Sequence, residues 1–175
     1  MLKFFIEPGY DVRPPERDHG NAGVDFFIPK FTKTFETAFN AKNLHHNAYL
    51  ECAAENWFIV IPEHGRANIP SGVRSRISSN VALEAQNKSG IATKYGLVYG
   101  AATVDANYQG IIHINLINTT NRTIRLPLDS KAVQFIPRLI DTAEVEVYVD
   151  STLEEFYKDF EFSNRGEGAF GSTGV

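Results

Sequence analysis

The stretch GLVYGAATVDANYQGIIHINLIN, Gly96–Asn118, decides the fold class of this chain. Leu97–Tyr99 is a short apolar run, and Ile112–Ile117 alternates apolar and polar residues with the period of two that is typical of a strand. Between these runs, the small residues Gly100–Ala102 and the turn sequence Asn107–Gly110 predict a hairpin. Small residues let backbone peptide groups approach a ligand closely, so this hairpin is a candidate binding element.

One carboxylate, Asp105, stands where the apolar run of the hairpin ends, three residues before the aromatic Tyr108. Beside a backbone that can present its peptide groups to a ligand, this acid is a candidate functional residue. An ordinary hairpin with a solvated aspartate gives the same pattern. The residues of the hairpin alone leave both interpretations open.

The composition places limits on size, partners and compartment. A chain of 175 residues is one domain by default, and its net charge of −4 does not favour long-range binding to nucleic acid or anionic membrane. The single cysteine, Cys52, excludes an intrachain disulfide and indicates a reducing compartment. No apolar run approaches the ~20 residues of a spanning helix, and the N-terminus has no signal-peptide pattern. We therefore expect a soluble, cytoplasmic protein without nucleic-acid or membrane partners.

Short strands with turn signals between them predict an all-β fold with little helix. The strands are expected at Leu2–Ile6, Ala22–Pro29, Trp57–Pro62, Ala67–Ile69, Ile124–Leu126, Lys131–Leu139 and Glu144–Val149. Near the C-terminus, Ser151 and Glu154 have the spacing of a capping box, which predicts a short helix over Thr152–Lys158.

Residues 31–56 are the least strand-like part of the chain, and we expect them to form a surface excursion. Apolar residues at three- and four-residue spacing predict a short helix there, namely Ala41, Leu44, Ala48 and Cys52. The adjacent His45 and His46 invite a metal interpretation. That interpretation is disfavoured, because neighbouring residues of a helix point in different directions.

Two further stretches carry groups that suit an anion. In NKSGIA, Asn87–Ala92, the Ser89 hydroxyl and the turn amides around Gly90 can make a compact phosphate site, although KSG alone matches many loops. The glycine-rich tail NRGEGAFGSTGV, residues 164–175, carries one cation, one aromatic ring and two hydroxyls. Such a tail suits a flap that closes on a nucleotide, and it also fits a floppy terminus.

Together these stretches resemble the homotrimeric dUTPase family. The family's five motifs occur in order, as AGVDFF, NKSGIA, GAATVDANYQG, SKAVQFI and RGEGAFGSTG, with the fifth and third the most specific. The resemblance covers the chain apart from residues 31–56, which look like an insertion. It implies a distorted jelly-roll (β-clip) domain over residues 1–163 and a covering tail over residues 164–175. It also implies a homotrimer whose sites draw on more than one chain.

The resemblance implies hydrolysis of dUTP to dUMP and pyrophosphate, which limits uracil in DNA and supplies dUMP for dTTP synthesis. Asp105 would activate the water that attacks the α-phosphorus, with Mg²⁺ held mainly by the substrate phosphates and by water. Tyr108 would pack on the sugar and exclude a 2′-hydroxyl. The backbone of the hairpin would pair with the uracil edge through Gly100, Ala101, Ala102, Thr103 and Val104.

The remaining motifs would bind the phosphates and cover the base. Phosphate contacts are implied for Lys88, Ser89 and Gly90, and Gln134 would lie near the α-phosphate. Asp25 would support the cationic second motif from beneath, although an aspartate entering a strand is more often a turn or capping residue. In the tail, the implied substrate-binding residues are Arg165, Phe170, Gly171, Ser172 and Thr173, with Phe170 stacked on the base.

The chain departs from the family pattern at four places. Lys88 replaces the usual arginine of the second motif and offers a point charge instead of a planar fork. Asn107 replaces an acid, Ala169 replaces a glycine, and Lys131–Val133 replaces Arg-Ile-Ala. These departures bear on substrate preference and rate, and they leave Asp105 and Tyr108 in place.

Two other functions fit parts of the pattern. A dCTP deaminase shares the fold, but its chemistry needs a glutamate beside the base, where the third motif offers Asp105. A regulatory protein on a dUTPase scaffold would bind a protein partner through residues 31–56, with or without catalysis.

Overall fold

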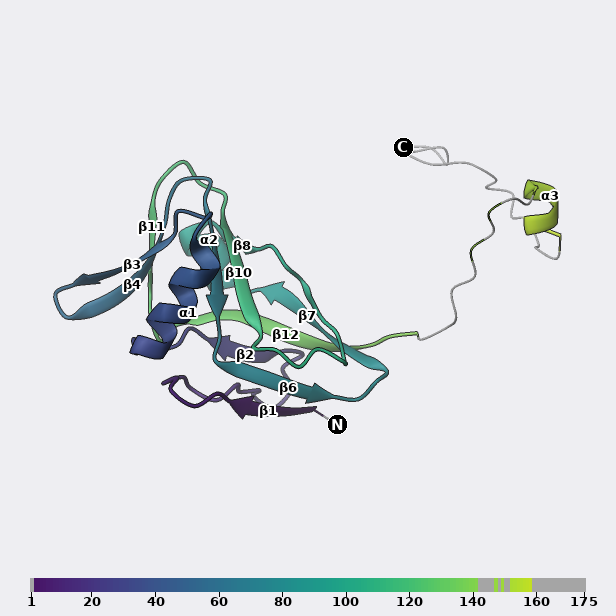
Figure 1. The fold of residues 1–175 in the computed structure, drawn as a ribbon, viewed down its shortest axis with the longest axis horizontal. Helices are drawn as coiled ribbons and strands as arrows, with labels where there is room; N and C mark the ends of the chain where they lie inside the picture. The colour runs from purple at the N-terminus through teal and green to yellow at the C-terminus, as the bar shows by residue number, and fades with distance from the viewer. Residues whose placement is uncertain (1, 142–146, 148, 150–151, 159–175) are drawn as a thin grey trace. The chain divides into compact units, whose positions relative to one another are not determined.

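The computed structural model describes residues 2–141, 147, 149 and 152–158. The chain divides into two compact units, Met1–Asp141 and Thr142–Val175. The first unit is built of strands with two helices among them, which confirms the all-β, jelly-roll-like fold class (Figure 1). No helix within the described ranges combines the length and the apolar content that crossing a membrane requires.

The predicted hairpin is confirmed at its two ends and divided in its middle. Strand β10 (His113–Asn118) pairs antiparallel with β8 (Leu97–Tyr99) on one side and with β5 (Arg66–Pro70) on the other. Between them, β9 (Thr103–Val104) leaves this sheet and pairs with β7 (Val81–Asn87). The small-residue loop therefore joins two sheets.

The second sheet has the order β2-β12-β7-β9, with β2 at Val24–Phe27 and β12 at Lys131–Leu139. Phe26 of β2 and Phe135 of β12 pack edge to face with ring centroids 4.8 Å apart, and both side chains are buried. Phe4 of β1 (Leu2–Ile6) packs on Phe26 from the other side, at 5.3 Å. These rings join the sheet to the two-stranded β1-β6 pair, where β6 spans Val73–Ile77.

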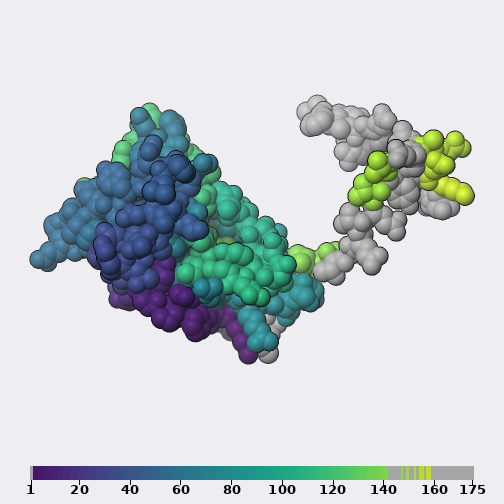
Figure 2. Space-filling view, in the orientation of Figure 1, coloured from purple at the N-terminus to yellow at the C-terminus, as the bar shows by residue number. Residues whose placement is uncertain are grey.

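Residues 31–56 contribute one helix to the core, so the expected surface excursion is wrong for this helix, whereas Leu44 and Tyr49 after it are exposed. Helix α1 spans Lys33–Asn43, and Thr32 caps it by accepting a hydrogen bond from the Phe35 N–H at 3.1 Å. Phe35 and Phe39, four residues apart on one face of the helix, are fully buried. In the space-filling view, this blue segment lies against the body of the first unit (Figure 2).

The helix was predicted from the wrong spacing. Of the four residues in that spacing, Ala41 lies in α1, whereas Leu44 follows the helix and is 76% exposed. Ala48 and Cys52 lie beyond it, and Cys52 belongs to β3 (Tyr49–Ala53). Strands β3, β4 (Asn56–Ile61) and β11 (Ile124–Pro127) form a further three-stranded sheet in the order β11-β4-β3. Binding of a protein partner through this segment stays a prediction.

In the second unit, the helix near residue 155 is confirmed with a shifted cap. Helix α3 spans Leu153–Phe156, and the Glu155 N–H donates to the Thr152 hydroxyl at 3.2 Å. The Glu155 carboxylate accepts from the Thr152 N–H at 2.8 Å. The capping box is therefore formed by Thr152 and Glu155, one residue later than predicted, and Ser151 of the predicted box lies outside the described residues. The predicted strand Glu144–Val149 falls mostly outside the described residues.

Replacing Phe39 by alanine tests the burial of α1. The lost side chain leaves a cavity in the core, so we expect Phe39→Ala to lower the free energy of unfolding by about 3–5 kcal/mol. Leu44→Ala is the matched control in the same segment, and its effect should stay within about 0.5 kcal/mol because Leu44 is exposed. Urea unfolding followed by circular dichroism measures both, and equal effects would contradict the packing of α1.

Candidate active site

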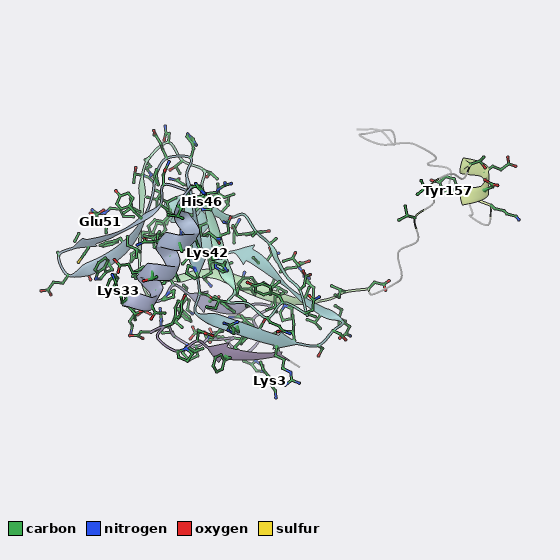
Figure 3. All side chains as sticks on the ribbon, viewed as in Figure 1. Lys3, Lys33, Lys42, His46, Glu51 and Tyr157 are labelled. Atoms are coloured by element: carbon green, nitrogen blue, oxygen red, sulfur yellow. The ribbon has the colours of Figure 1, made fainter. Side chains whose placement is uncertain are left out.

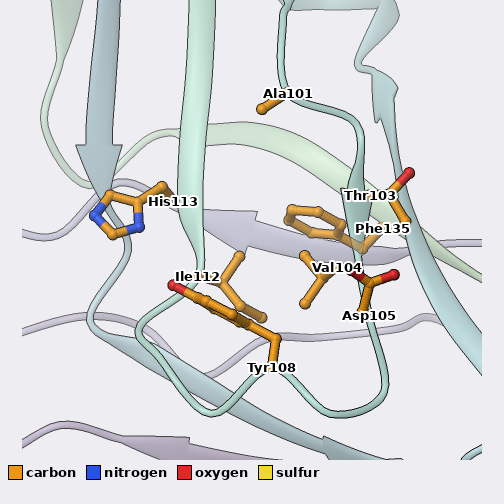
Figure 4. A pocket seen from close by; sticks show the side chains of 8 residues that line it. All are labelled: Ala101, Thr103, Val104, Asp105, Tyr108, Ile112, His113 and Phe135. Atoms are coloured by element: carbon orange, nitrogen blue, oxygen red, sulfur yellow. The ribbon is translucent and has the colours of Figure 1, made fainter.

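A cavity of about 170 Å³ opens beside the hairpin in the first unit. Its walls come from the start of β9, the loop after it, the start of β10 and the middle of β12 (Figure 4). The lining residues are Ala101, Thr103, Val104, Asp105, Tyr108, Ile112, His113 and Phe135. A volume below the ~300 Å³ of typical ligand sites suits one ring of a larger ligand.

The loop between β9 and β10 is closed by its own hydrogen bonds. The Tyr108 N–H donates to the Asp105 carbonyl at 3.1 Å, which makes a turn, and the Tyr108 hydroxyl donates to the Ile111 carbonyl at 2.9 Å. A Cβ on Gly110 would lie 2.3 Å from the Tyr108 hydroxyl oxygen. Glycine at this position therefore permits the Tyr108 ring to lie across the loop.

Arg74 of β6 connects the same loop to Glu7, which directly follows β1. Its Nη1 donates to the Gln109 carbonyl at 2.6 Å, and its Nε donates to the Glu7 carboxylate at 2.6 Å. The hydrogen bond from Arg74 holds the pKa of Glu7 below its usual value. The guanidinium of Arg74 thus positions the loop that carries Asp105.

The cavity combines an apolar wall with polar groups at its edges. In Figure 4, Val104, Ile112 and Phe135 lie between His113 on one side and Asp105 on the other. Burial lowers the pKa of His113, and the positive charge of Lys42 lowers it further. A backbone hydrogen bond at Ile111 raises the pKa, but by less than the other two effects lower it. His113 is thus neutral at pH 7, and Asp105 is exposed to solvent.

A second group of predicted residues gathers around the buried carboxylate of Asp25, which is 8% exposed. Lys88 Nζ lies 2.6 Å from Asp25 Oδ1, and Lys131 Nζ lies 3.1 Å from Oδ2. Burial acts to raise the pKa of Asp25, but the two lysines together outweigh it and hold the pKa below its usual value. The structure thus places Asp25 in contact with the second motif, whereas its part in ligand binding stays a prediction.

Ser89 and Gly90 begin helix α2 (Ser89–Tyr95), where the sequence predicted a turn. Lys88 is the N-cap residue of this helix, and Ser89 and Gly90 are both exposed. The serine hydroxyl and the first amides of the helix therefore lie next to one another, and the Lys88 ammonium group contacts Asp25.

Asp25 and Gln134 lie on the face of the β2-β12-β7-β9 sheet opposite Phe135. Side chains of consecutive strand residues point to opposite faces, and Phe135 of β12 lines the cavity. Its neighbour Gln134 therefore points to the other face, where it pairs in register with Asp25 and packs over Gly23. Gln134 is half-buried.

The outcome for the individual predicted residues is mixed. Ala101, Thr103, Val104, Asp105 and Tyr108 line the cavity. Gly100 and Ala102, which neighbour these residues in the sequence, do not line it. The predicted tail residues Arg165, Phe170, Gly171, Ser172 and Thr173 lie outside the described residues. Sequence reasoning missed Ile112, His113 and Phe135. The alternation in AVQFI could have predicted that the Phe135 side chain points to the face opposite that of Gln134. Nothing in the sequence around His113 predicted its place in the cavity.

Known proteins of one family are similar to this chain. A family model for dUTPase matches residues 39–174, which is well over half of the chain. The deoxyuridine 5′-triphosphate nucleotidohydrolase of Solanum lycopersicum is 30% identical over 156 residues, covering 89% of this chain and 85% of that protein.

Solved structures share the fold at lower identity. A dUTPase of Staphylococcus bacteriophage 80alpha with dUpNHpp superposes with a TM-score of 0.71 at 21% identity, covering 100% of this chain and 99% of that one. A dUTPase from phage phi11 of S. aureus, whose structure describes the coordination of a structural Mg(II) ion, gives a TM-score of 0.62 at 19% identity. That match covers 87% of this chain and 99% of the phage protein.

Replacing Asp25 by asparagine tests the ion-pair cluster through its pH dependence. A carboxylate whose pKa is lowered by folding stabilises the protein above its unfolded pKa, and this stabilisation is lost as the pH falls through the folded pKa. We expect Asp25→Asn to cost about 1.5–3 kcal/mol at pH 7, the value of hydrogen bonds to a charged group. The cost should shrink as the pH falls from about 5 towards 3, around and below the usual Asp pKa.

Urea unfolding of both proteins across this pH range measures the difference. Asp18→Asn, at an exposed loop aspartate, is the control and should show no such trend. A cost for Asp25→Asn that stays constant with pH would contradict the role of the two lysines.

Proposed function

Because the chain belongs to the dUTPase family, we propose that it is a dUTP diphosphatase, which hydrolyses dUTP to dUMP and pyrophosphate. The observation that carries the proposal is the cavity in which Asp105 and Tyr108 meet a small-residue loop and an apolar wall. The cavity has room for one pyrimidine ring, and the exposed Asp105 leaves space at its mouth for water and for the phosphates of a nucleotide.

In this proposal Asp105 is the general base. Its carboxylate accepts a proton from a water molecule, the water oxygen bonds to the α-phosphorus, and the bond from that phosphorus to the bridging oxygen of pyrophosphate breaks. The carboxylate sits at the turn closed by the Tyr108 N–H, and the Arg74–Gln109 hydrogen bond holds the loop in place. Such positioning supplies a large part of the rate in phosphoryl transfer.

Tyr108 and the hairpin backbone give the proposed selectivity. The Tyr108 ring is held over Gly110 by its bond to the Ile111 carbonyl, so it forms a fixed surface for a deoxyribose ring. A 2′-hydroxyl would have to fit against this surface, which disfavours ribonucleotides. The backbone of residues 100–104 would pair with the uracil edge, with Val104, Ile112 and Phe135 as the apolar wall.

The phosphates would bind at the second group of residues. Lysine has three N–H donors, and Asp25 takes one from Lys88, so the ammonium group can still donate to a phosphate oxygen. Ser89, Gly90 and the neighbouring Gln134 would complete the contacts. Among the described residues, no group of three His, Cys, Asp or Glu side chains is placed to hold a metal ion. We therefore propose that Mg²⁺ comes with the triphosphate, where it neutralises charge and orients the phosphates.

A complete site would draw on more than one chain. We propose that the cavity of one chain meets the phosphate-binding group of its neighbour in a homotrimer, the assembly that the family resemblance implies. The tail, residues 164–175, would cover the nucleotide, with Arg165 and the hydroxyls on phosphate and Phe170 on the base.

Deamination of dCTP is the main rival reaction. That chemistry needs a glutamate as proton shuttle beside the base, and the residues that line the cavity include Asp105 but no glutamate. Release of ammonia from dCTP, without release of pyrophosphate from dUTP, would support the rival.

The central test compares pyrophosphate release from dUTP, dTTP, dCTP and UTP in the presence of Mg²⁺. We expect dUTP to be the preferred substrate. Asp105→Asn should lower kcat by about 10²–10⁴-fold, the usual contribution of a general base, while a non-hydrolysable dUTP analogue still binds.

Asp11→Asn, at an exposed aspartate outside the cavity, is the control and should keep full activity. Loss of analogue binding in Asp105→Asn, with normal turnover of the substrate that does bind, would contradict the role of Asp105. A protein that releases pyrophosphate from none of the four nucleotides would overturn the proposed function.

Truncation of the chain after Asn164 tests the tail and the trimer together. Without the cover we expect kcat for dUTP to fall by about 10²-fold, the size of loss that misplaced reacting groups bring. Asp105→Asn chains still carry tails, so trimers assembled from a mixture of the two inactive proteins should regain activity. Full activity of the truncated protein, or a mixture no more active than its parts, would contradict a tail-covered site shared between chains.

A further inference from the structure

A second, polar cavity lies on the first unit, away from the residues that line the proposed active site. It has a volume of about 320 Å³, and three segments form it: the connection from α1 to β3, the turn from β4 to β5, and β10. The lining residues are His45, His46, Asn47, His64, Gly65, Arg66 and Ile117. Three imidazoles and one guanidinium group thus meet at a cavity whose lining residues include no carboxylate.

A buried asparagine fixes the segment that carries His45 and His46. Asn43 is 5% exposed, and its amide donates to the Phe39 carbonyl at 2.7 Å and to the Asn68 carbonyl at 2.9 Å. Its Oδ1 accepts from the Asn68 N–H at 2.8 Å, and its own carbonyl accepts from the His46 N–H at 3.0 Å. Figure 3 shows His46 beyond the end of α1.

A second buried asparagine fixes the turn that carries His64 and Arg66. Asn118 is 1% exposed, and its amide donates to the Ile61 and Pro62 carbonyls at 3.2 and 2.8 Å. Its backbone N–H donates to the Gly65 carbonyl at 2.8 Å. Both sides of the cavity are therefore held in place before any ligand binds, which is the condition for a preorganised site.

The backbone at the cavity is strained on both sides. Asn47 and His64 have φ values of 56° and 53°, in the left-handed region that non-glycine residues seldom adopt. Strain of this kind persists where the surrounding structure enforces it, and it gathers at ligand sites.

The charges of the cavity favour an anion over a cation. Burial lowers the pKa of His46, and the positive Arg66 and then His45 add to this shift. The Nδ1 atom of His46 is buried without a hydrogen-bond partner among the described residues.

A metal ion does not fit the same groups. No set of three His, Cys, Asp or Glu side chains in the described part of the chain is placed to hold one, although His45, His46 and His64 line one cavity. Arg66 would also repel a cation. Its fork of N–H donors instead matches the oxygens of a phosphate or sulfate group.

We propose that this cavity binds a small tetrahedral oxyanion of the phosphate or sulfate class, through Arg66 and the imidazoles of His45, His46 and His64. The site is separate from the proposed active site, since the two cavities share no lining residue. The proposal therefore stands or falls independently of dUTP hydrolysis.

The five histidines of the chain allow a direct test by NMR. Sodium sulfate is titrated into the full-length protein at pH 6.5, with sodium chloride holding the ionic strength constant, and the imidazole signals are assigned by single His→Gln variants. We expect saturable shifts of the His45, His46 and His64 signals, while the exposed His19 signal stays in place. Inorganic phosphate should produce the same pattern.

Arg66→Gln should weaken sulfate binding at least about tenfold, the effect of losing a charge-assisted hydrogen bond, and should leave dUTP hydrolysis unchanged. Arg17→Gln, at an exposed arginine that donates to the Asn21 carbonyl, is the matched control and should bind sulfate normally. Shifts that are equal at all five histidines, or sulfate binding that Arg66→Gln does not weaken, would overturn the proposal. Tighter binding of Zn²⁺ than of sulfate at these histidines would overturn it as well.

Discussion

The buried carboxylate of Asp25, held between two lysines, is the constraint on which the arrangement of this protein depends. Asp25 lies on β2, Lys88 at the end of the strand before α2, and Lys131 at the start of β12, so one side chain ties three segments together. A carboxylate that is only 8% exposed would be costly without these partners, since burial of an unpaired charge is strongly unfavourable. The same contact fixes the Lys88 side chain at the start of α2, so folding and the proposed phosphate site share one interaction.

Local periodicity predicted most of the strands, because the alternation of buried and exposed positions is a property of the strand itself. It did not predict β9, since the two residues Thr103 and Val104 are too few to show a period, and their pairing with β7 is a long-range choice. It also misplaced the helix in residues 31–56. Phe35 and Phe39, which pack in the core, were the informative pair, whereas Leu44 fits the helical spacing and lies exposed.

The candidate site was predictable to the extent that it is local. Asp105, Tyr108 and the small residues before them lie within one loop, and the structure brings most of them to one cavity. The remaining wall of the cavity depends on which face of β12 is turned to that loop. The register of β12 with its neighbouring strands β2 and β7 determines that face. Gln134, predicted from the fourth motif, pairs with Asp25 on one face, and its neighbour Phe135, which was not predicted, completes the cavity on the other.

The register of the sheet places Thr103 on the same face as Gln134, because Thr103 pairs with Glu84 and Gln134 pairs with Gln86, two residues further along β7. Strand alternation therefore separates Phe135 from Gln134, and it does not separate the strand before Asp105 from Gln134. Replacement of arginine by lysine is compatible with this geometry, because an ammonium group has three donors and can contact Asp25 of its own chain and a phosphate at the same time.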